Sequence, residues 1–219
     1  QITKRRQAVG GVQMIYVVGL GPGDVSYLTQ KGDQVIKEAD ILIGAKRNLE
    51  SIEGIEGFNG TKIEMSTKLE ELVDFLKTNS DKKVTVLASG DPLIYGIGKY
   101  LSRHIPKEKL QIISGISAVQ YMFARIPLDM NDLYITSSHG KTPDFDRLLS
   151  YPKVAMVTDE LVGPSVIAAE ILKRDLEKVM IVGENLTYSD EKITHFKPHE
   201  ISEDIKFKRN VVVILDEEQ

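Results

Sequence analysis

The chain has 219 residues, 42% of them hydrophobic, so it can bury a substantial core and is long enough for one large domain or two small ones. Its formal net charge of −4, with no basic excess, argues against nucleic acid as a partner. Cysteine is absent, which excludes disulfides, thiolate catalysis and zinc–sulfur sites and fits a reducing compartment such as the cytoplasm. No apolar run approaches the ~20 residues of a membrane span.

Residues 1–13 show neither hydrophobic periodicity nor the apolar core of a signal peptide. We interpret them as a flexible leader, of native or vector origin, and expect the fold to begin at Met14. After it, short β-branched runs alternate with segments of helical spacing, which is typical of a mainly parallel sheet covered by helices. The predicted elements of this half are strands at 14–18, 41–43, 84–88 and 110–114, with helices over 28–39 and 69–76.

The C-terminal half has a different order of elements. Strands are predicted at 133–137, 153–158, 178–183, 191–196 and 210–215, and Gly163-Pro164 opens a helix before the third of them. No helix pattern separates the last two strands, so this second sheet is expected to be mixed. We therefore predict two α/β domains, residues 14–114 with a mainly parallel sheet and residues 115–219 with a mixed sheet.

The first predicted strand runs into the loop GLGPGD, which holds three glycines, a proline and an aspartate in six residues. A dinucleotide-binding loop requires G-x-G-x-x-G, and although Gly19 and Gly21 fit, Asp24 occupies the last glycine position. Pro22 also lacks the backbone N–H that a pyrophosphate would need. No Gly-Lys-Ser/Thr follows, so a P-loop is excluded as well. Taken alone, the loop predicts a tight turn capped by Asp24.

Two further glycine-containing loops follow predicted strands. SGDPLIYGIG at 89–98 comes directly after the strand at 84–88, and SGISA at 114–118 comes after the strand at 110–114. Open α/β sheets bind ligands at the carboxyl ends of their strands, where glycine lets a ligand approach the backbone closely. Each loop alone could be an ordinary turn. Three of them at successive strand ends predict one shared binding site.

In combination these motifs resemble the tetrapyrrole methylase family, and the resemblance runs from Met14 to the C-terminus. It implies two α/β domains that bind S-adenosylmethionine in the cleft between them, rather than a Rossmann fold. The residues that carry it are GLGPGD with Leu28-Thr29, Gly90-Asp91-Pro92, Gly115-Ile-Ser-Ala118 and Glu184-Asn185. Four further stretches, ADILIGAKRNLE, SGDPLIYGIG, SGISAVQYMFARI and SSHG, are most similar to the branch that methylates C5 of cobalt-precorrin-7, or the equivalent precorrin, in cobalamin biosynthesis.

The same resemblance implies which residues contact the cofactor. One departure concerns Leu186, because members that methylate uroporphyrinogen have glycine after Glu-Asn; Glu-Asn-Leu itself suits the C5-methylating branch. The cofactor contacts that the resemblance implies are Pro22, Gly90, Asp91, Ile94 through its backbone, Ser117, Ala118, Thr158 and Leu186.

The implied reaction asks little of side chains. S-adenosylmethionine carries its own leaving group, so transfer depends mainly on holding carbon, methyl and sulfur in line at about 3–3.5 Å. No metal is required, and we assign no catalytic residue.

Two residues are candidate substrate contacts. His139 either contacts the substrate or accepts a proton, or it is a loop histidine without a catalytic task. Asp24 either faces the substrate or caps a helix.

Other charged residues leave similar alternatives open. Lys46, Arg47, Arg125 and Lys141 either meet the carboxylates of a corrin precursor or lie in solvent. His195 and His199 are four residues apart, but Pro198 interrupts the helix that a metal-binding pair would need, which argues against a metal site.

Three other functions compete with C5 methylation. A sister methylase would act on another corrin carbon, on diphthamide or on ribosomal RNA; a nicotinamide oxidoreductase or a non-catalytic tetrapyrrole carrier would bind no S-adenosylmethionine. The absence of a basic excess disfavours ribosomal RNA. The resemblance further implies a homodimer that works beside a separate C15-methylating decarboxylase.

Overall fold

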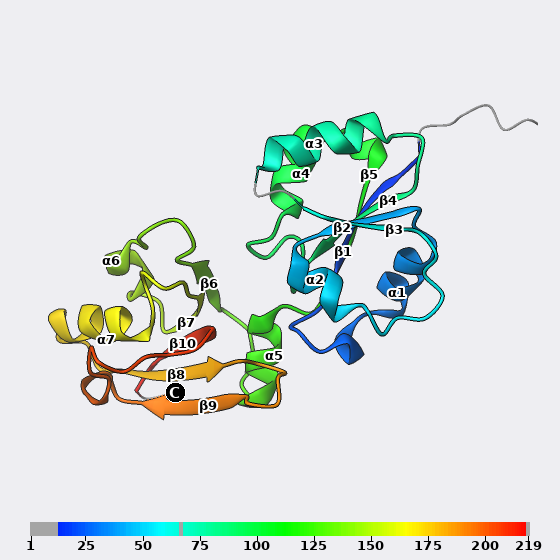
Figure 1. Ribbon diagram of the computed structural model, residues 1–219. Helices are drawn as coiled ribbons and strands as arrows, with labels where there is room; N and C mark the ends of the chain where they lie inside the picture. Colours follow the sequence, from blue (N-terminus) through cyan, green and yellow to red (C-terminus); the bar gives the residue numbers. More distant parts are fainter. Residues whose placement is uncertain (1–12, 66–67, 218–219) are drawn as a thin grey trace, which may run out of the picture. The chain divides into compact units, whose positions relative to one another are not determined.

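The computed structural model describes residues 13–65 and 68–217, so the expected leader lies outside the described residues except for Gln13. The chain divides into two compact units, Gln1–Ile116 (unit 1) and Ser117–Gln219 (unit 2), each with its own sheet (Figure 1). Within the described ranges, no helix is long and apolar enough to cross a membrane.

Unit 1 contains a five-stranded sheet in the order β3-β2-β4-β1-β5, and every neighbouring pair is parallel. All carboxyl ends of its strands therefore lie along one edge. The central strand β4 is buried along its whole length, as expected for a parallel sheet with both faces covered. The strands are β1 (Ile15–Gly19), β2 (Ile41–Gly44), β3 (Thr61–Glu64), β4 (Val84–Ala88) and β5 (Leu110–Ile113).

Helices cover both faces of this sheet. On one face, α1 (Gln30–Lys37) and α2 (Lys46–Ser51) enclose an apolar core that includes Ile36, Leu42 and Leu87. On the other face, α3 (Leu69–Thr78) and α4 (Gly98–His104) pack on a second core built around Val86 and Leu76 (Figure 1). Alternate residues of β4 thus point to opposite cores, as the two-residue period of a strand requires.

Unit 2 contains a mixed sheet in the order β6-β7-β10-β8-β9, in which β6 and β7 are parallel and the other neighbours antiparallel. One face packs against α6 (Phe145–Leu148) and α7 (Pro164–Lys173). On the other face, α5 (Ala118–Arg125) lies close to β8, because a Cβ on Gly183 would come within 2.4 Å of Met122 Sδ. The strands are β6 (Tyr134–Ser137), β7 (Lys153–Val157), β8 (Lys178–Glu184), β9 (Lys192–Phe196) and β10 (Asn210–Asp216).

The predicted fold class is confirmed: a parallel sheet comes first and a mixed sheet second. For three of the short elements that were not predicted, the structure gives a physical reason. Three of the four residues of β3 are exposed, so no apolar run marks it. Ala45 precedes α2 without a capping side chain, and α6 has only four residues.

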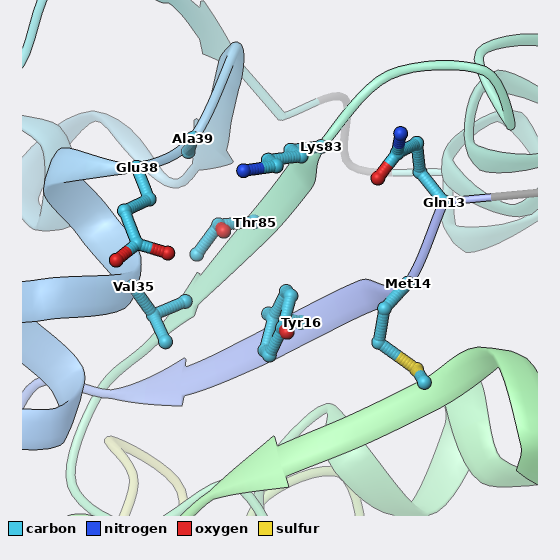
Figure 2. Close-up of a pocket in the computed structure, with 8 residues that line it drawn as sticks. All are labelled: Gln13, Met14, Tyr16, Val35, Glu38, Ala39, Lys83 and Thr85. Carbon is cyan, nitrogen blue, oxygen red and sulfur yellow. The ribbon is translucent and has the colours of Figure 1, made fainter. Parts of the chain in front are cut away.

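A small pocket opens at the amino-terminal side of the unit 1 sheet, between β1, β4 and the end of α1 (Figure 2). Its volume is about 60 Å³, and Tyr16, Glu38, Lys83 and Thr85 are among the residues that line it. Thr85 is 1% exposed, and its hydroxyl has no hydrogen-bond partner among the described residues. Such a hydroxyl pays its desolvation cost without compensation.

Replacing Thr85 by valine, which has nearly the same shape, should therefore raise the free energy of unfolding by about 1 kcal/mol in urea denaturation. The matched control is Thr158→Val, because the Thr158 hydroxyl is also buried but donates to Asn210 Oδ1 at 2.7 Å. That variant should be destabilised. Equal destabilisation of both variants would contradict the prediction, because it would mean that the Thr85 hydroxyl is satisfied.

Candidate cofactor site

The three glycine loops of unit 1 meet at the carboxyl edge of its sheet. They follow β1, β4 and β5, and β1 lies between the other two strands. Gly21 and Gly90 form an antiparallel bridge, in which Gly90 N–H donates to Gly21 O at 2.8 Å and Gly21 N–H donates to Gly90 O at 3.2 Å. The loops after β1 and β4 are therefore joined through their backbones.

The third loop packs against the other two without room for a side chain. A Cβ on Gly115 would come within 2.2 Å of Gly90 O, and a Cβ on Gly19 would come within 2.6 Å of Gly115 N. Gly90 also has a φ of +61°, which favours glycine. The close contacts at Gly19 and Gly115, together with the positive φ of Gly90, thus bring three loops into contact through their backbones. We call this meeting point of the three loops the cradle.

Asp91 fastens this arrangement with both of its carboxylate oxygens. Oδ1 accepts a hydrogen bond from Leu93 N–H at 2.8 Å, and Oδ2 accepts one from Gly115 N–H at 3.1 Å. The carboxylate therefore links the loop after β4 to the loop after β5. The predicted contact between Asp91 and a cofactor stays a prediction, and the visible task of its side chain is to hold the loops.

A cation reaches the same edge from α2. Arg47 Nη2 donates to Ser89 Oγ at 3.2 Å, and Ser89 Oγ donates to Asn48 Oδ1 at 2.8 Å. Asn48 in turn donates to Leu87 O at 3.3 Å. Lys46 instead pairs with Glu50 on the exposed side of the helix at 3.9 Å. Of the two neighbouring cations of α2 considered from the sequence, Arg47 is the one whose side chain bonds to the loop after β4.

The loop after β1 continues into the short 3-10 helix η1 (Val25–Tyr27). Asp24 caps it, because its Oδ1 accepts a hydrogen bond from Ser26 N–H at 2.8 Å. This hydrogen bond holds the pKa of the Asp24 carboxyl below its usual value. Helix capping, one of the two roles considered for Asp24, is thus present; a substrate contact remains a prediction. Pro22 in the same loop and Ile94 in the loop after β4 are both partly buried.

The predicted cofactor contacts of unit 2 have side chains engaged in the fold. Ser117 caps α5 in a capping box with Gln120, and Ala118 is the first residue of the helix. Thr158 donates to Asn210, as described above. Leu186 is 6% exposed and lies near Met122, because a Cβ on Gly183 would approach both side chains. A ligand at these positions would have to use mainly backbone groups.

The predicted residues that follow β6, β7 and β8 share one edge of the unit 2 sheet. Ser137 pairs with Val157 at the ends of β6 and β7, and Asn210 at the start of β10 pairs with Glu184 at the end of β8. Thr158 follows the end of β7 directly, and His139 and Leu186 come two residues after the ends of β6 and β8. The sheet thus gathers the sequence-predicted residues of unit 2 other than Ser117 and Ala118.

Two of these loops are tied together by Ser138 and Asp159. Ser138 Oγ donates to Val162 O at 3.1 Å and accepts from Asp159 N–H at 2.9 Å. Asp159 Oδ1 accepts from Val162 N–H at 2.8 Å and from Leu161 N–H at 3.0 Å. The hydrogen bond from Val162 N–H is the main cause that holds the pKa of Asp159 below its usual value, and it outweighs the opposing effect of burial.

Glu191 organises the loop that carries Leu186 and was not singled out from the sequence. Its carboxylate accepts hydrogen bonds from Tyr121 Oη at 2.6 Å, Arg125 Nε at 2.8 Å and Thr187 N–H at 2.7 Å. Burial raises the pKa of Glu191, but these hydrogen bonds together lower it below its usual value. Arg125 therefore pairs with a carboxylate of this protein, an alternative that the sequence did not offer.

The two histidines considered as a metal pair lie in different elements. His195 lies in β9 and His199 in the short 3-10 helix η3 (Pro198–Glu200). Among the residues that the structure describes, no group of three or more His, Cys, Asp or Glu is arranged to hold a metal ion.

The lowered pKa of Asp159 predicts a pH-dependent contribution to stability. A carboxyl whose folded-state pKa is depressed stabilises the fold above its unfolded-state pKa, and this contribution is lost as pH falls through the folded-state value. Asp159→Asn should therefore reduce the free energy of unfolding at neutral pH, and the gap to the wild type should shrink below about pH 4. Urea denaturation at both pH values measures this. Glu160→Gln, at the exposed neighbour, is the control; a gap for Asp159→Asn that does not change with pH would contradict the assignment.

Comparison with known proteins places these features in a family. The family model of tetrapyrrole (corrin/porphyrin) methylases matches residues 14–201. The cobalt-precorrin-7 C(5)-methyltransferase of Salmonella typhimurium is 41% identical over 205 residues, covering 93% of this chain and all of that protein. The probable cobalt-precorrin-7 C(5)-methyltransferase of Methanocaldococcus jannaschii is 34% identical over 189 residues, covering 83% of this chain and 88% of that protein.

Solved structures share the fold. The precorrin-6Y methylase of cobalamin biosynthesis from Archaeoglobus fulgidus has a TM-score of 0.72 at 22% identity and covers 94% of this chain and all of its own. The uroporphyrin-III C-methyltransferase of Thermus thermophilus, complexed with S-adenosylhomocysteine, has a TM-score of 0.73 at 20% identity, covering 92% of this chain and 97% of its own. This chain belongs to the tetrapyrrole (corrin/porphyrin) methylase family.

Proposed function

We propose that this protein is an S-adenosylmethionine-dependent C-methyltransferase of cobalamin biosynthesis that methylates C5 of cobalt-precorrin-7 or the equivalent precorrin. The observation that carries the proposal is the 41% identity to the Salmonella typhimurium enzyme of that name over its whole length. Three of the loops on which the resemblance rests converge at the carboxyl edge of the unit 1 sheet.

The cradle of unit 1 suits a ligand held by backbone groups. Gly19, Gly90 and Gly115 let three loops approach one another closely, and Asp91 fixes two of them. We propose that Pro22, Gly90, Asp91 and Ile94 bind the cofactor in this unit, together with the positions of unit 2 described above (Ser117, Ala118, Thr158 and Leu186). When bound, S-adenosylmethionine supplies an activated methyl group on a sulfonium leaving group.

The residues of this chain then contribute mainly position. Transfer of a methyl group needs donor and acceptor in line, and rigid loops reduce the entropy lost in reaching that geometry. The bonds made by Asp91 in unit 1 and by Glu191 in unit 2 both immobilise loops of the proposed site. His139 is our proposed substrate contact, with Asp24 as a second one, and Arg47 is a cation suited to a substrate carboxylate.

Three further features belong to the same proposal and rest on the family resemblance. The protein acts as a homodimer, it is cytoplasmic, and a separate protein carries out methylation at C15 with decarboxylation. A second candidate function is methylation of another ring carbon of a corrin precursor. It is favoured by the fold that this chain shares with a uroporphyrin-III C-methyltransferase, whose name gives a different tetrapyrrole substrate.

Incubation with cobalt-precorrin-7 and methyl-labelled S-adenosylmethionine tests the reaction. We expect one labelled methyl group on C5, located by NMR, and one equivalent of S-adenosylhomocysteine. Label on another ring carbon would contradict the assigned position and support the second candidate. Bound cofactor with no label in an intact substrate would contradict the enzymatic function, whereas substrate binding without any binding of S-adenosylmethionine would favour a tetrapyrrole carrier.

Asp91→Ala tests the cradle separately from the chemistry. Loss of two hydrogen bonds to a carboxylate should loosen the loops and weaken S-adenosylmethionine binding by about 10-fold or more, measured by calorimetry. The matched control is Asp40→Ala, which removes a carboxylate that accepts from Lys83 N–H at 2.8 Å before β4, at the opposite edge of the same sheet. Equal weakening in both variants would show a general loss of stability instead.

A further inference from the structure

The SSHG stretch at the end of β6 contains a hydrogen-bonded histidine. Ser137 is the last residue of the strand and is 2% exposed, whereas His139, two residues on, is exposed. The chain turns immediately afterwards: Lys141 N–H donates to Ser138 O at 3.0 Å, and Gly140 has a φ of +70°. The backbone thus holds the imidazole next to the buried serine.

Ser137 makes two contacts with this histidine. The Ser137 Oγ accepts a hydrogen bond from the backbone N–H of His139 at 3.2 Å. The same Oγ lies 3.1 Å from Nδ1 of the His139 ring. A hydroxyl carries one proton, and within the described parts of the chain Nδ1 is the only acceptor that the Ser137 hydroxyl reaches. A buried hydroxyl without an acceptor would cost about 1–3 kcal/mol, so the hydroxyl donates to Nδ1.

A neutral imidazole has one N–H donor and one acceptor nitrogen. Because Nδ1 accepts from Ser137, the ring proton lies on Nε2. We infer that Ser137 fixes His139 in the Nε2–H tautomer, so that the ring meets the substrate as a hydrogen-bond donor and is not the acceptor of the proton released at C5. The assignment of the tautomer stands on its own; the substrate role rests on the proposed function.

Of the interpretations that the sequence left open for His139, this assignment decides between substrate contact and proton acceptance. A general base needs a free lone pair directed at the proton it removes. Here one nitrogen is engaged by Ser137 and the other already carries a proton. A donor, in contrast, suits a carboxylate or carbonyl oxygen of a tetrapyrrole. Ser137 is therefore a positioning residue that acts through His139.

The tautomer can be read directly by NMR of the full chain with ¹⁵N-labelled histidine, at alkaline pH where imidazole is neutral. The protein has four histidines, and the set of signals missing in His139→Gln identifies this ring. We expect a protonated Nε2 and an unprotonated, hydrogen-bonded Nδ1. The opposite pattern, with the proton on Nδ1, would overturn the inference whether or not the protein methylates a tetrapyrrole.

Serine variants provide the matched comparison. Ser137→Ala should shift the Nδ1 signal away from its hydrogen-bonded position and allow a mixture of tautomers, and Ser137→Thr, which keeps the hydroxyl, should restore the wild-type signals. Ser138→Ala removes a buried neighbouring hydroxyl that bonds to Val162 O and not to the ring. This control variant should leave the histidine signals unchanged. Unchanged histidine signals in Ser137→Ala would overturn the role given to Ser137.

Steady-state kinetics then separate donor from base. His139→Gln places an amide N–H close to the position of Nε2 but cannot accept a proton. If the ring is a donor, this variant should keep kcat within a few-fold, and His139→Ala should raise KM for the tetrapyrrole about 10-fold. A fall in kcat of about 10²-fold or more in both variants would overturn the inference, because it is the result expected for a general base.

Discussion

The structure of unit 1 depends on the contact between backbones at Gly19, Gly90 and Gly115. Three parallel strands end side by side, and their loops approach so closely that a single Cβ at Gly115 would overlap Gly90 O. Only glycine satisfies this constraint. Once the loops are this close, Asp91 can reach amides on two of them, and Arg47 can reach the serine that precedes Gly90. The other hydrogen bonds of the candidate site in unit 1 depend on this close contact between the three loops.

In unit 2 the loops at the edge of the sheet are held together by side-chain hydrogen bonds instead of close contacts at glycines. Its sheet is mixed, so strand ends and strand beginnings both occur along one edge, and the loops need different anchors. Ser138 and Asp159 connect two loops, Thr158 is bonded to Asn210, and Glu191 holds a third loop through three donors. Each anchor is a short polar group that satisfies backbone or side-chain donors near the surface, where a ligand would meet the loops. The two units thus order their loops by different physical means.

Local patterns predicted most of the fold, because short runs rich in apolar and β-branched residues, such as 84–88, favour a buried strand. The loops of the candidate site were also predictable, since glycine spacing at strand ends is a local signal. The task of Asp91 was not, because Gly115 lies 24 residues away and becomes its neighbour only through the strand order β4-β1-β5. The role of Glu191 was not predictable for the same reason, because its partner Tyr121 is 70 residues away in the sequence. A partner brought close by topology leaves no trace in the spacing of residues.

The packing of α5 has a consequence for how the chain can be divided. Met122 on this helix fills the space over Gly183 of β8, and Tyr121 and Arg125 bind the carboxylate that anchors the loop around Leu186. Asn185 and Thr187, on either side of Leu186, have positive φ values of 45° and 74°. Such a conformation costs about 1–3 kcal/mol for each residue and persists only where the surrounding structure imposes it. A C-terminal fragment expressed by itself would therefore need to start before Ser117. One that starts after Arg125 would expose the underside of its sheet and release the segment around Leu186 into other conformations.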